Sequence, residues 1–176
     1  MPTIEKPENV SGAAQVYGDA QVFGAAQVSG DAQVYGAAWV FGDARVFGDA
    51  QVYGAAQVFG AAWVFGDAQV YGDAQVYGDA RVYGDARVFG AAQVYGAAQV
   101  SGDAWVFGDA RVFGWYVGGW ARVNAPQHVQ TYRDREGALW TCYRTELGSR
   151  IVRRDQPVEP EDAPEIVRLL AVEVAR

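Results

Sequence analysis

Apolar and polar residues alternate with a fixed period of six along most of the chain. Val recurs at every sixth position over Val10–Val112, Gly follows two positions later over Gly12–Gly114, and Ala completes the pattern over Ala14–Ala110. The unit reads V-(Y/F/S)-G-(D/A)-A-(Q/R/W). Because residues two apart in a strand point to the same face, the pattern predicts short A-Q-V-Y strands whose Ala and Val face inward.

The Gly-Asp or Gly-Ala pair between these strands predicts a sharp bend, since Gly tolerates positive φ and Asp can accept hydrogen bonds from turn amides. If every corner turns the same way, three sides close a triangle of roughly 18 residues, with successive coils about 4.8 Å apart. The repeat then forms about six coils, on the order of 28 Å long. The alternative, a meander of tight hairpins, would leave the Val and Ala face of a single sheet open to water.

The repeat of residues 10–114 resembles the hexapeptide-repeat superfamily, in which an aliphatic residue at every sixth position marks a left-handed parallel β-helix. The handedness rests on this resemblance alone, because crossovers between parallel strands are usually right-handed. We therefore predict an all-β solenoid: a left-handed parallel β-helix of about six triangular 18-residue coils with a small β-hairpin and α-helix at the C-terminus. A run of hexads with a short tail also resembles uncharacterised bacterial and prophage proteins, which implies a part in a phage assembly.

The chain divides into three predicted parts. Residues 1–9 form an N-terminal cap, in which prolines and charged residues cover the strand edges that a β-helix exposes (Pro2, Glu5, Lys6, Pro7 and Glu8). Residues 10–125 form the β-helix, and residues 126–176 form a strand and helix module that caps the rod or docks it to a partner. Near residue 112 the period slips by one, since Val117 and Val123 follow Val112, and the bulky Trp115, Tyr116 and Trp120 suggest a widened last coil.

Beyond Pro126 the hexad pattern stops. Residues 127–134 and 138–145 are predicted as strands joined across 135–137, with 149–155 as a third candidate. Residues 155–164 are predicted as a linker, followed by a helix from about Pro164 with an apolar stripe. The single cysteine, Cys142, is interpreted as a packed strand residue because Trp140 and Tyr143 flank it in a predicted strand.

Composition narrows the function classes. The net charge of −7 argues against nonspecific binding to nucleic acid or anionic membranes, which depends on clustered Lys and Arg. The sequence has no apolar run near the length of a membrane span, and its first residues lack a signal-peptide layout. One cysteine cannot form an internal disulfide. We therefore expect a cytoplasmic protein, or a virion-associated one if it is phage-encoded.

Candidate catalytic residues are few. The resemblance implies acyltransferases that use a histidine as general base, and related γ-type carbonic anhydrases that bind zinc with three histidines. This chain has one histidine, His128, which lies beyond the repeat, and no loop interrupts the hexads. We predict no enzymatic activity, no cofactor and no metal, with His128 as a strand or cap residue. A degenerate acyltransferase-like protein is the enzymatic alternative.

Outward residues 18 apart sort into columns. The first ladder is unbroken and aromatic: Tyr17, Tyr35, Tyr53, Tyr71, Phe89 and Phe107. The second ladder is also aromatic: Phe23, Phe41, Phe59, Tyr77, Tyr95 and Phe113. The third column is interrupted: Ser11, Ser29, Phe47, Phe65, Tyr83 and Ser101. Gln-rich columns run beside them, with one tryptophan expected on each face at Trp39, Trp63 and Trp105.

The two ladders are the candidate binding residues. Part of their role is to stabilise the rod by stacking along its axis. Each aromatic side chain buries about 150–250 Å², so a ladder would exceed the few hundred Å² of apolar patch that monomers usually expose. We therefore expect at least one face to be covered. A homotrimer is the favoured partner state, as in many members of this superfamily, and another structural protein or a glycan is the alternative.

An aligned column of carboxylates raises the question of calcium: Asp31, Asp49, Asp67, Asp85 and Asp103. Unit charges 4.8 Å apart in water repel by only about 0.9 kcal/mol, so the column needs no cation. The predicted function is a noncatalytic structural or protein-interaction scaffold that self-associates. The alternative is a carbohydrate-binding module that uses the first ladder.

Overall fold

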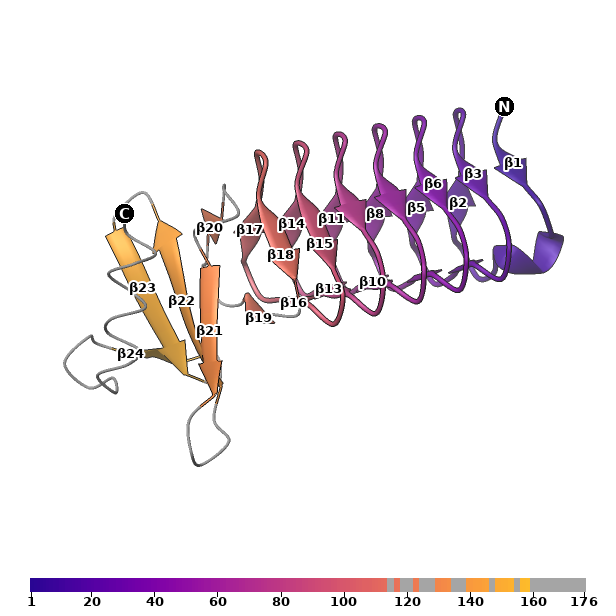
Figure 1. Cartoon of the computed structure of the whole chain (residues 1–176). Helices are drawn as coiled ribbons and strands as arrows, with labels where there is room; N and C mark the ends of the chain where they lie inside the picture. Colours follow the sequence, from indigo (N-terminus) through magenta and orange to yellow (C-terminus); the bar gives the residue numbers. More distant parts are fainter. Residues whose placement is uncertain are drawn as a thin grey trace.

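The computed structural model describes residues 1–113, 116–117, 122–123, 129–133, 139–145, 148–153 and 156–158. These residues form a rod of stacked parallel coils followed by a small antiparallel sheet (Figure 1). The rod has three parallel sheets, and within each sheet a strand pairs with the third strand before it and the third strand after it. The predicted all-β parallel solenoid of about six coils is confirmed, with Val58 paired to Val76 and likewise along the rod.

The three sheets form the three sides of the rod. Sheet A comprises β1 (Thr3–Ile4), β3 (Gln21–Val22), β6 (Trp39–Val40), β9 (Gln57–Val58), β12 (Gln75–Val76), β15 (Gln93–Tyr95) and β18 (Arg111–Phe113). Sheet B comprises β4 (Gln27–Val28), β7 (Arg45–Val46), β10 (Trp63–Phe65), β13 (Arg81–Tyr83), β16 (Gln99–Val100) and β19 (Tyr116–Val117). Sheet C comprises β2 (Gln15–Val16), β5 (Gln33–Val34), β8 (Gln51–Val52), β11 (Gln69–Val70), β14 (Arg87–Val88), β17 (Trp105–Val106) and β20 (Arg122–Val123).

The strands are shorter than the predicted four residues. Most contain two residues, the Val and the polar or aromatic residue before it, and only a few include the following aromatic, as β10 does with Phe65. The corner glycine follows two positions after the Val, and its positive φ turns the chain out of the extended conformation. Pairing nevertheless continues through the corner, where the Asp19 amide donates to the Gly36 carbonyl at 2.8 Å.

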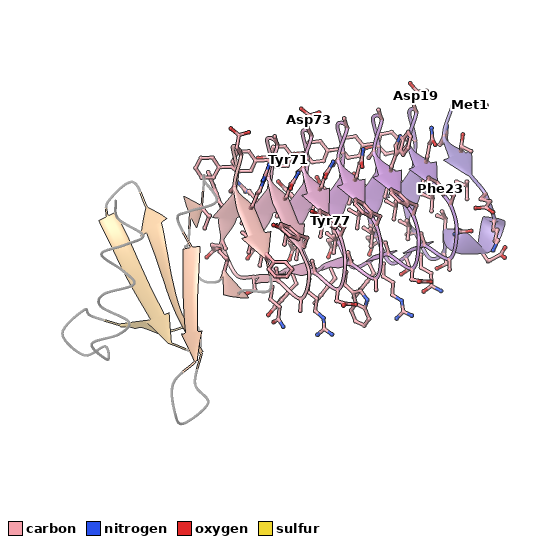
Figure 2. All side chains as sticks on the ribbon, in the orientation of Figure 1. Met1, Asp19, Phe23, Tyr71, Asp73 and Tyr77 are labelled. Atoms are coloured by element: carbon pink, nitrogen blue, oxygen red, sulfur yellow. The ribbon has the colours of Figure 1, made fainter. Side chains whose placement is uncertain are left out.

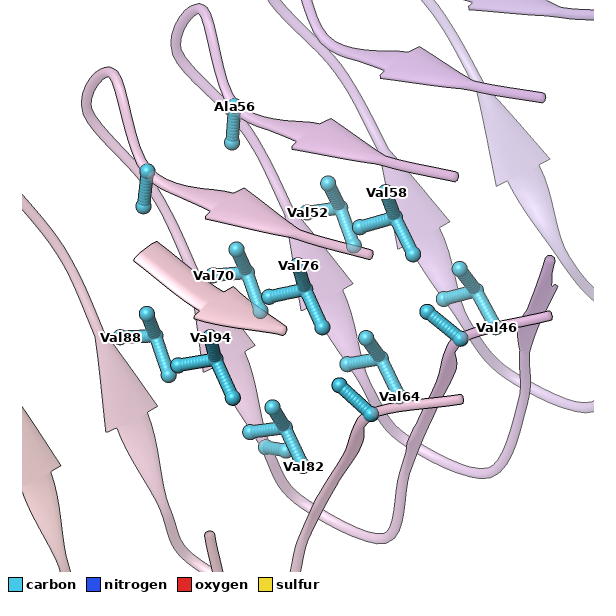
Figure 3. Close-up of a cluster of buried hydrophobic side chains, with 14 of the residues drawn as sticks. Val46, Val52, Ala56, Val58, Val64, Val70, Val76, Val82, Val88 and Val94 are labelled. Carbon is cyan, nitrogen blue, oxygen red and sulfur yellow. The ribbon is translucent and has the colours of Figure 1, made fainter. Parts of the chain in front are cut away.

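The core consists of the two inward positions of the hexad. Every Ala and Val from Ala20 to Val112 at these positions has 0% exposure. Figure 3 shows these valines in rows along the rod, with Val58, Val76 and Val94 in successive coils. Burying a valine side chain contributes about 1.5–3 kcal/mol relative to leaving it exposed. Because the same two small residue types fill the interior throughout, each coil stacks on the next in the same register.

The corner glycines stack on one another along the rod. Gly60 has a φ of 71°, and a Cβ added there would lie 2.9 Å from the amide nitrogen of Gly78 in the next coil. An L-residue is disfavoured at this φ, and the spacing of the coils leaves no room for a side chain. Glycine is therefore required at this corner both by conformation and by contact.

The N-terminal residues complete the first coil. β1 pairs with β3, and a 3-10 helix, η1 (Pro7–Asn9), follows it. The Asn9 backbone amide donates to the Lys6 carbonyl at 3.0 Å, and the Asn9 side-chain nitrogen donates to the carbonyls of Gly24 and Ala26 in the next coil, at 3.3 and 2.6 Å. The Glu5 carboxylate accepts a hydrogen bond from the Gly24 amide at 2.7 Å. The first residues thus act as a cap made of one strand, one turn and two side chains.

The end of the repeat shows the predicted slip. Val117 pairs with Val100 and Val123 with Val106, an offset of 17 where the rest of the rod has 18. The coil is thus one residue shorter at the corner after β18. Trp115 and Trp120, on which the expectation of a widened coil depended, lie outside the described residues.

The C-terminal sheet has four antiparallel strands: β21 (Val129–Arg133), β22 (Leu139–Thr145), β23 (Gly148–Arg153) and β24 (Gln156–Val158). The three predicted strands are present, and Cys142 lies in β22 opposite Gln130 and Ile151. The linker predicted over 155–164 is wrong in its first part, because β24 pairs there with β23. β22 lies beside β20 at the end of the rod. His128 and the helix predicted from about Pro164 lie outside the described residues.

Candidate functional site

The three outward faces of the rod carry different columns of side chains. Each strand contributes one outward residue before its Val and one after it, and the strand register carries these residues into columns. The first ladder lies on sheet C, the second ladder on sheet A and the third column on sheet B. Figure 2 shows Phe23 and Tyr77 on the outward side of sheet A, with Asp19 and Asp73 at the corners between sheets C and A.

The aromatic rings of both ladders are stacked. In the first ladder the ring centroids of Tyr35 and Tyr53 lie 4.8 Å apart with 1° between the planes, and the other pairs lie at 4.9–5.2 Å. The second ladder has pairs at 4.8–5.1 Å, of which only Tyr95 and Phe113 are tilted, by 38°. These separations match the rise of one coil. The predicted site residues are therefore brought together in two stacks.

Stacking changes what the ladders present to solvent. Each inner ring covers the faces of its neighbours and is half-buried, whereas the end residues Tyr17 and Phe113 are 44% and 58% exposed. The sequence-based expectation counted whole side chains, whereas each stacked ring exposes only part of its surface. Inner rings of the ladders present their edges and, for tyrosines, their hydroxyls.

The pKa values of three stacked tyrosine hydroxyls are raised. Burial raises the pKa of Tyr53 above its ordinary value of 10.0, and the neighbouring Tyr35 and Tyr71 act in the same direction, while Arg87 opposes them. The pKa values of Tyr35 and Tyr77 are raised for the same first reason, burial. A stacked tyrosine thus resists ionisation because its anion would lose hydration and would form beside other phenols.

Among the described residues of the rod, one tryptophan lies on each face, as predicted. Each packs edge to face against an aromatic residue of the preceding coil: Phe23 with Trp39, Phe47 with Trp63 and Phe89 with Trp105, with centroids 6.0–6.3 Å apart and planes at 73–74°. Such T-shaped pairs are a favoured aromatic geometry. Each tryptophan therefore connects the column of residues before the valines with the aromatic column after them.

Sheet B carries a cluster that the sequence-based prediction missed. The guanidinium carbons of Arg45 and Arg81 each lie 5.2 Å from the centre of the Trp63 ring. The indole is thus held between two cations, and each contact is attractive. The signal in the sequence was the spacing, since Arg45, Trp63 and Arg81 are 18 residues apart. On sheet C, Arg87 makes the same contact with Trp105 at 5.2 Å.

The predicted carboxylate column lies at the corner after sheet B, and Asp49, Asp67 and Asp85 are exposed there. Within the part of the chain that the structure describes, no group of three His, Cys, Asp or Glu residues could hold a metal ion. The Met1 ammonium forms an ion pair with Asp19 at 2.9 Å. The Met1 ammonium lowers the pKa of Asp19, first by hydrogen bonding and then by its charge. None of the described helices has the length and hydropathy to cross a membrane.

Stacked parallel coils, a Val and Ala interior and corner glycines at each turn define a parallel β-solenoid repeat protein. The YdcK beta solenoid repeat matches the chain at residues 14–30, 26–42, 74–90 and 80–96, all within the rod. No curated protein and no solved structure matches the chain.

Proposed function

We propose that this chain is a noncatalytic structural scaffold, a rigid rod that associates laterally with other copies of itself. The observation that carries the proposal is the uninterrupted register of the coils. Every pair formed among strands β2 to β18 has an offset of 18 residues, and no insertion enlarges a corner between them. Solenoid stability arises from such contacts between neighbouring repeats. Six coil steps separate β1 from β18 in sheet A, which corresponds to roughly 29 Å.

The side chains of the rod favour a structural role over catalysis. The hexads offer Asp carboxylates at exposed corners and aromatic rings in stacks, and the one histidine of the chain lies outside the hexads. General acid–base chemistry needs a titratable group held near a bound substrate. The wider hypothesis of a phage assembly rests on the resemblance of the repeat and is tested by what co-purifies with the native protein.

Lateral self-association fits the faces better than sugar binding. Binding a sugar on an aromatic platform requires an open ring face, and inner rings such as Tyr53 have both faces against neighbours at 4.8–4.9 Å. Ring edges, tryptophans and glutamines remain available along flat sides, which suits contact with another flat protein surface. The superfamily resemblance favours three subunits around one axis.

Light scattering on the purified full chain at micromolar concentration tests this function. We expect a mass that is a multiple of the protomer mass of 19.0 kDa. A monomer across the concentration range would contradict the self-association. Incubation with acetyl-CoA and candidate sugars tests the noncatalytic part, and acyl transfer above the uncatalysed rate would contradict it. Binding to a glycan array that is lost on Tyr53→Ala would favour the sugar-binding alternative.

A further inference from the structure

Five consecutive rows of sheet B, from β4 to β16, and the corners after them form a patch whose row order is almost the same from either end of the rod. We call this surface face B. Its five rows are residues 25–31, 43–49, 61–67, 79–85 and 97–103, with sequences AAQVSGD, DARVFGD, AAWVFGD, DARVYGD and AAQVSGD. The strand register places these rows side by side in this order. The row of Val10 and Ser11 lies beyond β4, and β19 lies beyond β16. The two outer rows of face B are identical to each other. The two rows on either side of the central row differ at one position, which is Phe47 in one row and Tyr83 in the other.

The residue types of face B are ordered about its central row. Trp63 and Phe65 lie in the central row, Arg45 and Arg81 lie in the rows beside it, and Gln and Ser occupy the outermost rows. Protein interfaces commonly have an aromatic and arginine-rich centre surrounded by polar residues. The rows of sheets A and C show no such order about a centre. Face B is therefore the side of the rod that is organised as an interface.

Two columns of face B are chemically complementary. The column before the valines is Gln27, Arg45, Trp63, Arg81 and Gln99, and every member has an N–H group to donate. The corner column has an aspartate in all five rows, and a carboxylate only accepts hydrogen bonds. The corners that follow sheets A and C have alanine in several rows and offer no complete acceptor column. Between the donor and acceptor columns lies the aromatic centre of the third column.

A two-fold axis parallel to the rod would match these columns. A two-fold rotation about an axis that runs along the third column exchanges the donor side and the acceptor side of face B. Each row keeps its height along the rod. The donor column of one copy then faces the acceptor column of the other, so Arg45 meets Asp49 of the second copy and Arg81 meets Asp85 of the second copy. The rings of Phe47, Phe65 and Tyr83 face their own symmetry mates. Such an interface is self-complementary, as a two-fold interface must be.

The charges on face B favour this arrangement. Within the described residues neither Arg45 nor Arg81 has a carboxylate within 4.0 Å, and both guanidiniums are held over Trp63. Neighbouring aspartates of the corner column carry like charges one coil apart and repel each other. Opposing cations from a second copy would remove this repulsion, and charge-assisted hydrogen bonds are the stronger kind.

We infer that face B is the self-association surface, and that two copies pair side by side with their rods parallel. This inference rests on the proposed self-association and adds the face, the orientation and the pairing of charges. It yields a dimer, whereas the superfamily resemblance favours a trimer.

Charge exchange between two variants of the full chain tests the inference. One variant carries Arg45→Glu and Arg81→Glu, and the other carries Asp49→Arg and Asp85→Arg. Each alone places like charges opposite one another and should be monomeric by light scattering at a concentration where the wild type is a dimer. An equimolar mixture restores opposite charges at every exchanged contact and should form a heterodimer. All four positions are exposed, and circular dichroism shows whether each variant keeps the wild-type fold.

The matched control carries Arg87→Glu and Arg111→Glu, which lie on sheets C and A and change the net charge as much as Arg45→Glu and Arg81→Glu do. It should remain a dimer. If the wild type associates but both face B variants still associate with themselves, or their mixture stays monomeric, face B is not the surface and the inference fails alone. A wild-type trimer would also overturn the two-fold pairing. A monomeric wild type would overturn both this inference and the proposed self-association.

Discussion

The rings of Tyr35 and Tyr53 lie 4.8 Å apart and are parallel to within 1°. Tyr71 covers the other face of Tyr53 at 4.9 Å, whereas Tyr17 stacks with Tyr35 alone. A residue within a ladder therefore contributes two stacking contacts, and a residue at its end contributes one.

Removal of an inner ring is expected to cost more than removal of an end ring. An aromatic pair contributes about 0.5–1.5 kcal/mol beyond its burial. Tyr53→Ala removes two pairs and should lower the free energy of unfolding by about 1–3 kcal/mol from stacking alone. Tyr17→Ala, the matched control, should lose about half as much. Urea denaturation measures both changes, and equal losses would show that stacking does not determine the contribution of these residues.

A side chain at a corner glycine is expected to destabilise the rod. Gly60→Ala places a Cβ 2.9 Å from the Gly78 amide nitrogen at a φ of 71°. The left-handed conformation alone costs about 1–2 kcal/mol, and the contact adds to this cost. Ala61→Ser, at the exposed neighbouring position, should leave the melting temperature nearly unchanged. Thermal unfolding monitored by circular dichroism compares the two variants, and equal melting temperatures would contradict the role assigned to the glycine stack.

The stacked tyrosines make the rod sensitive to alkali. The pKa of Tyr53 is higher in the folded chain than its ordinary value of 10.0, because burial and neighbouring tyrosines disfavour the anion. The unfolded chain therefore releases this proton first as the pH rises. The contribution to stability is complete below about pH 10 and is lost as the pH rises through the folded-state pKa.

Tyr53→Phe keeps the ring and removes the ionisable hydroxyl. We expect its melting temperature to fall less steeply above pH 10 than that of the wild type, with little difference near neutral pH. Tyr17→Phe, at the exposed end of the same ladder, is the control. Parallel pH dependences for the wild type and Tyr53→Phe would show that ionisation of this residue is not linked to unfolding.

The N-terminal cap is expected to depend on one side chain. Asn9 is 3% exposed, and its side-chain nitrogen donates to the carbonyls of Gly24 and Ala26. Asn9→Ala removes the side-chain donor to both carbonyls, and an unsatisfied buried polar group costs about 1–3 kcal/mol. Glu8→Ala, at an exposed neighbouring position, should have little effect. Hydrogen exchange measured by mass spectrometry should show faster exchange in the first coil of Asn9→Ala, and protection equal to that of the wild type would contradict the assignment.

The repeat made the rod predictable in detail. Each hexad position has one structural task, so the recurrence of Val, Ala and Gly specified the sides, the core and the columns, and the observed pairing of Val58 with Val76 follows from counting. Features that occur once had no such support. Asn9 satisfies two carbonyls by a geometry that no local pattern signals, and β24 includes Pro157, a residue that disfavours strand prediction.

The candidate surface was predictable in part. Columns of aromatic residues followed from the period, but the loss of exposed area on stacking did not, because it depends on ring orientation and not only on position. The two cations on Trp63 were present in the sequence as a spacing of 18. Their significance appears only when the rows of sheet B are compared as a surface.

A coil that repeats every 18 residues also separates the length of the rod from the identity of its sides. Gain or loss of one whole turn, such as residues 55–72, would change the length by about 4.8 Å and return each later residue to its own side. Gain or loss of a single hexad would instead carry each later residue to the neighbouring side and scramble the aromatic and charged columns. Genetic change in multiples of a full turn is therefore a route by which such a protein can be resized while its surfaces are inherited intact.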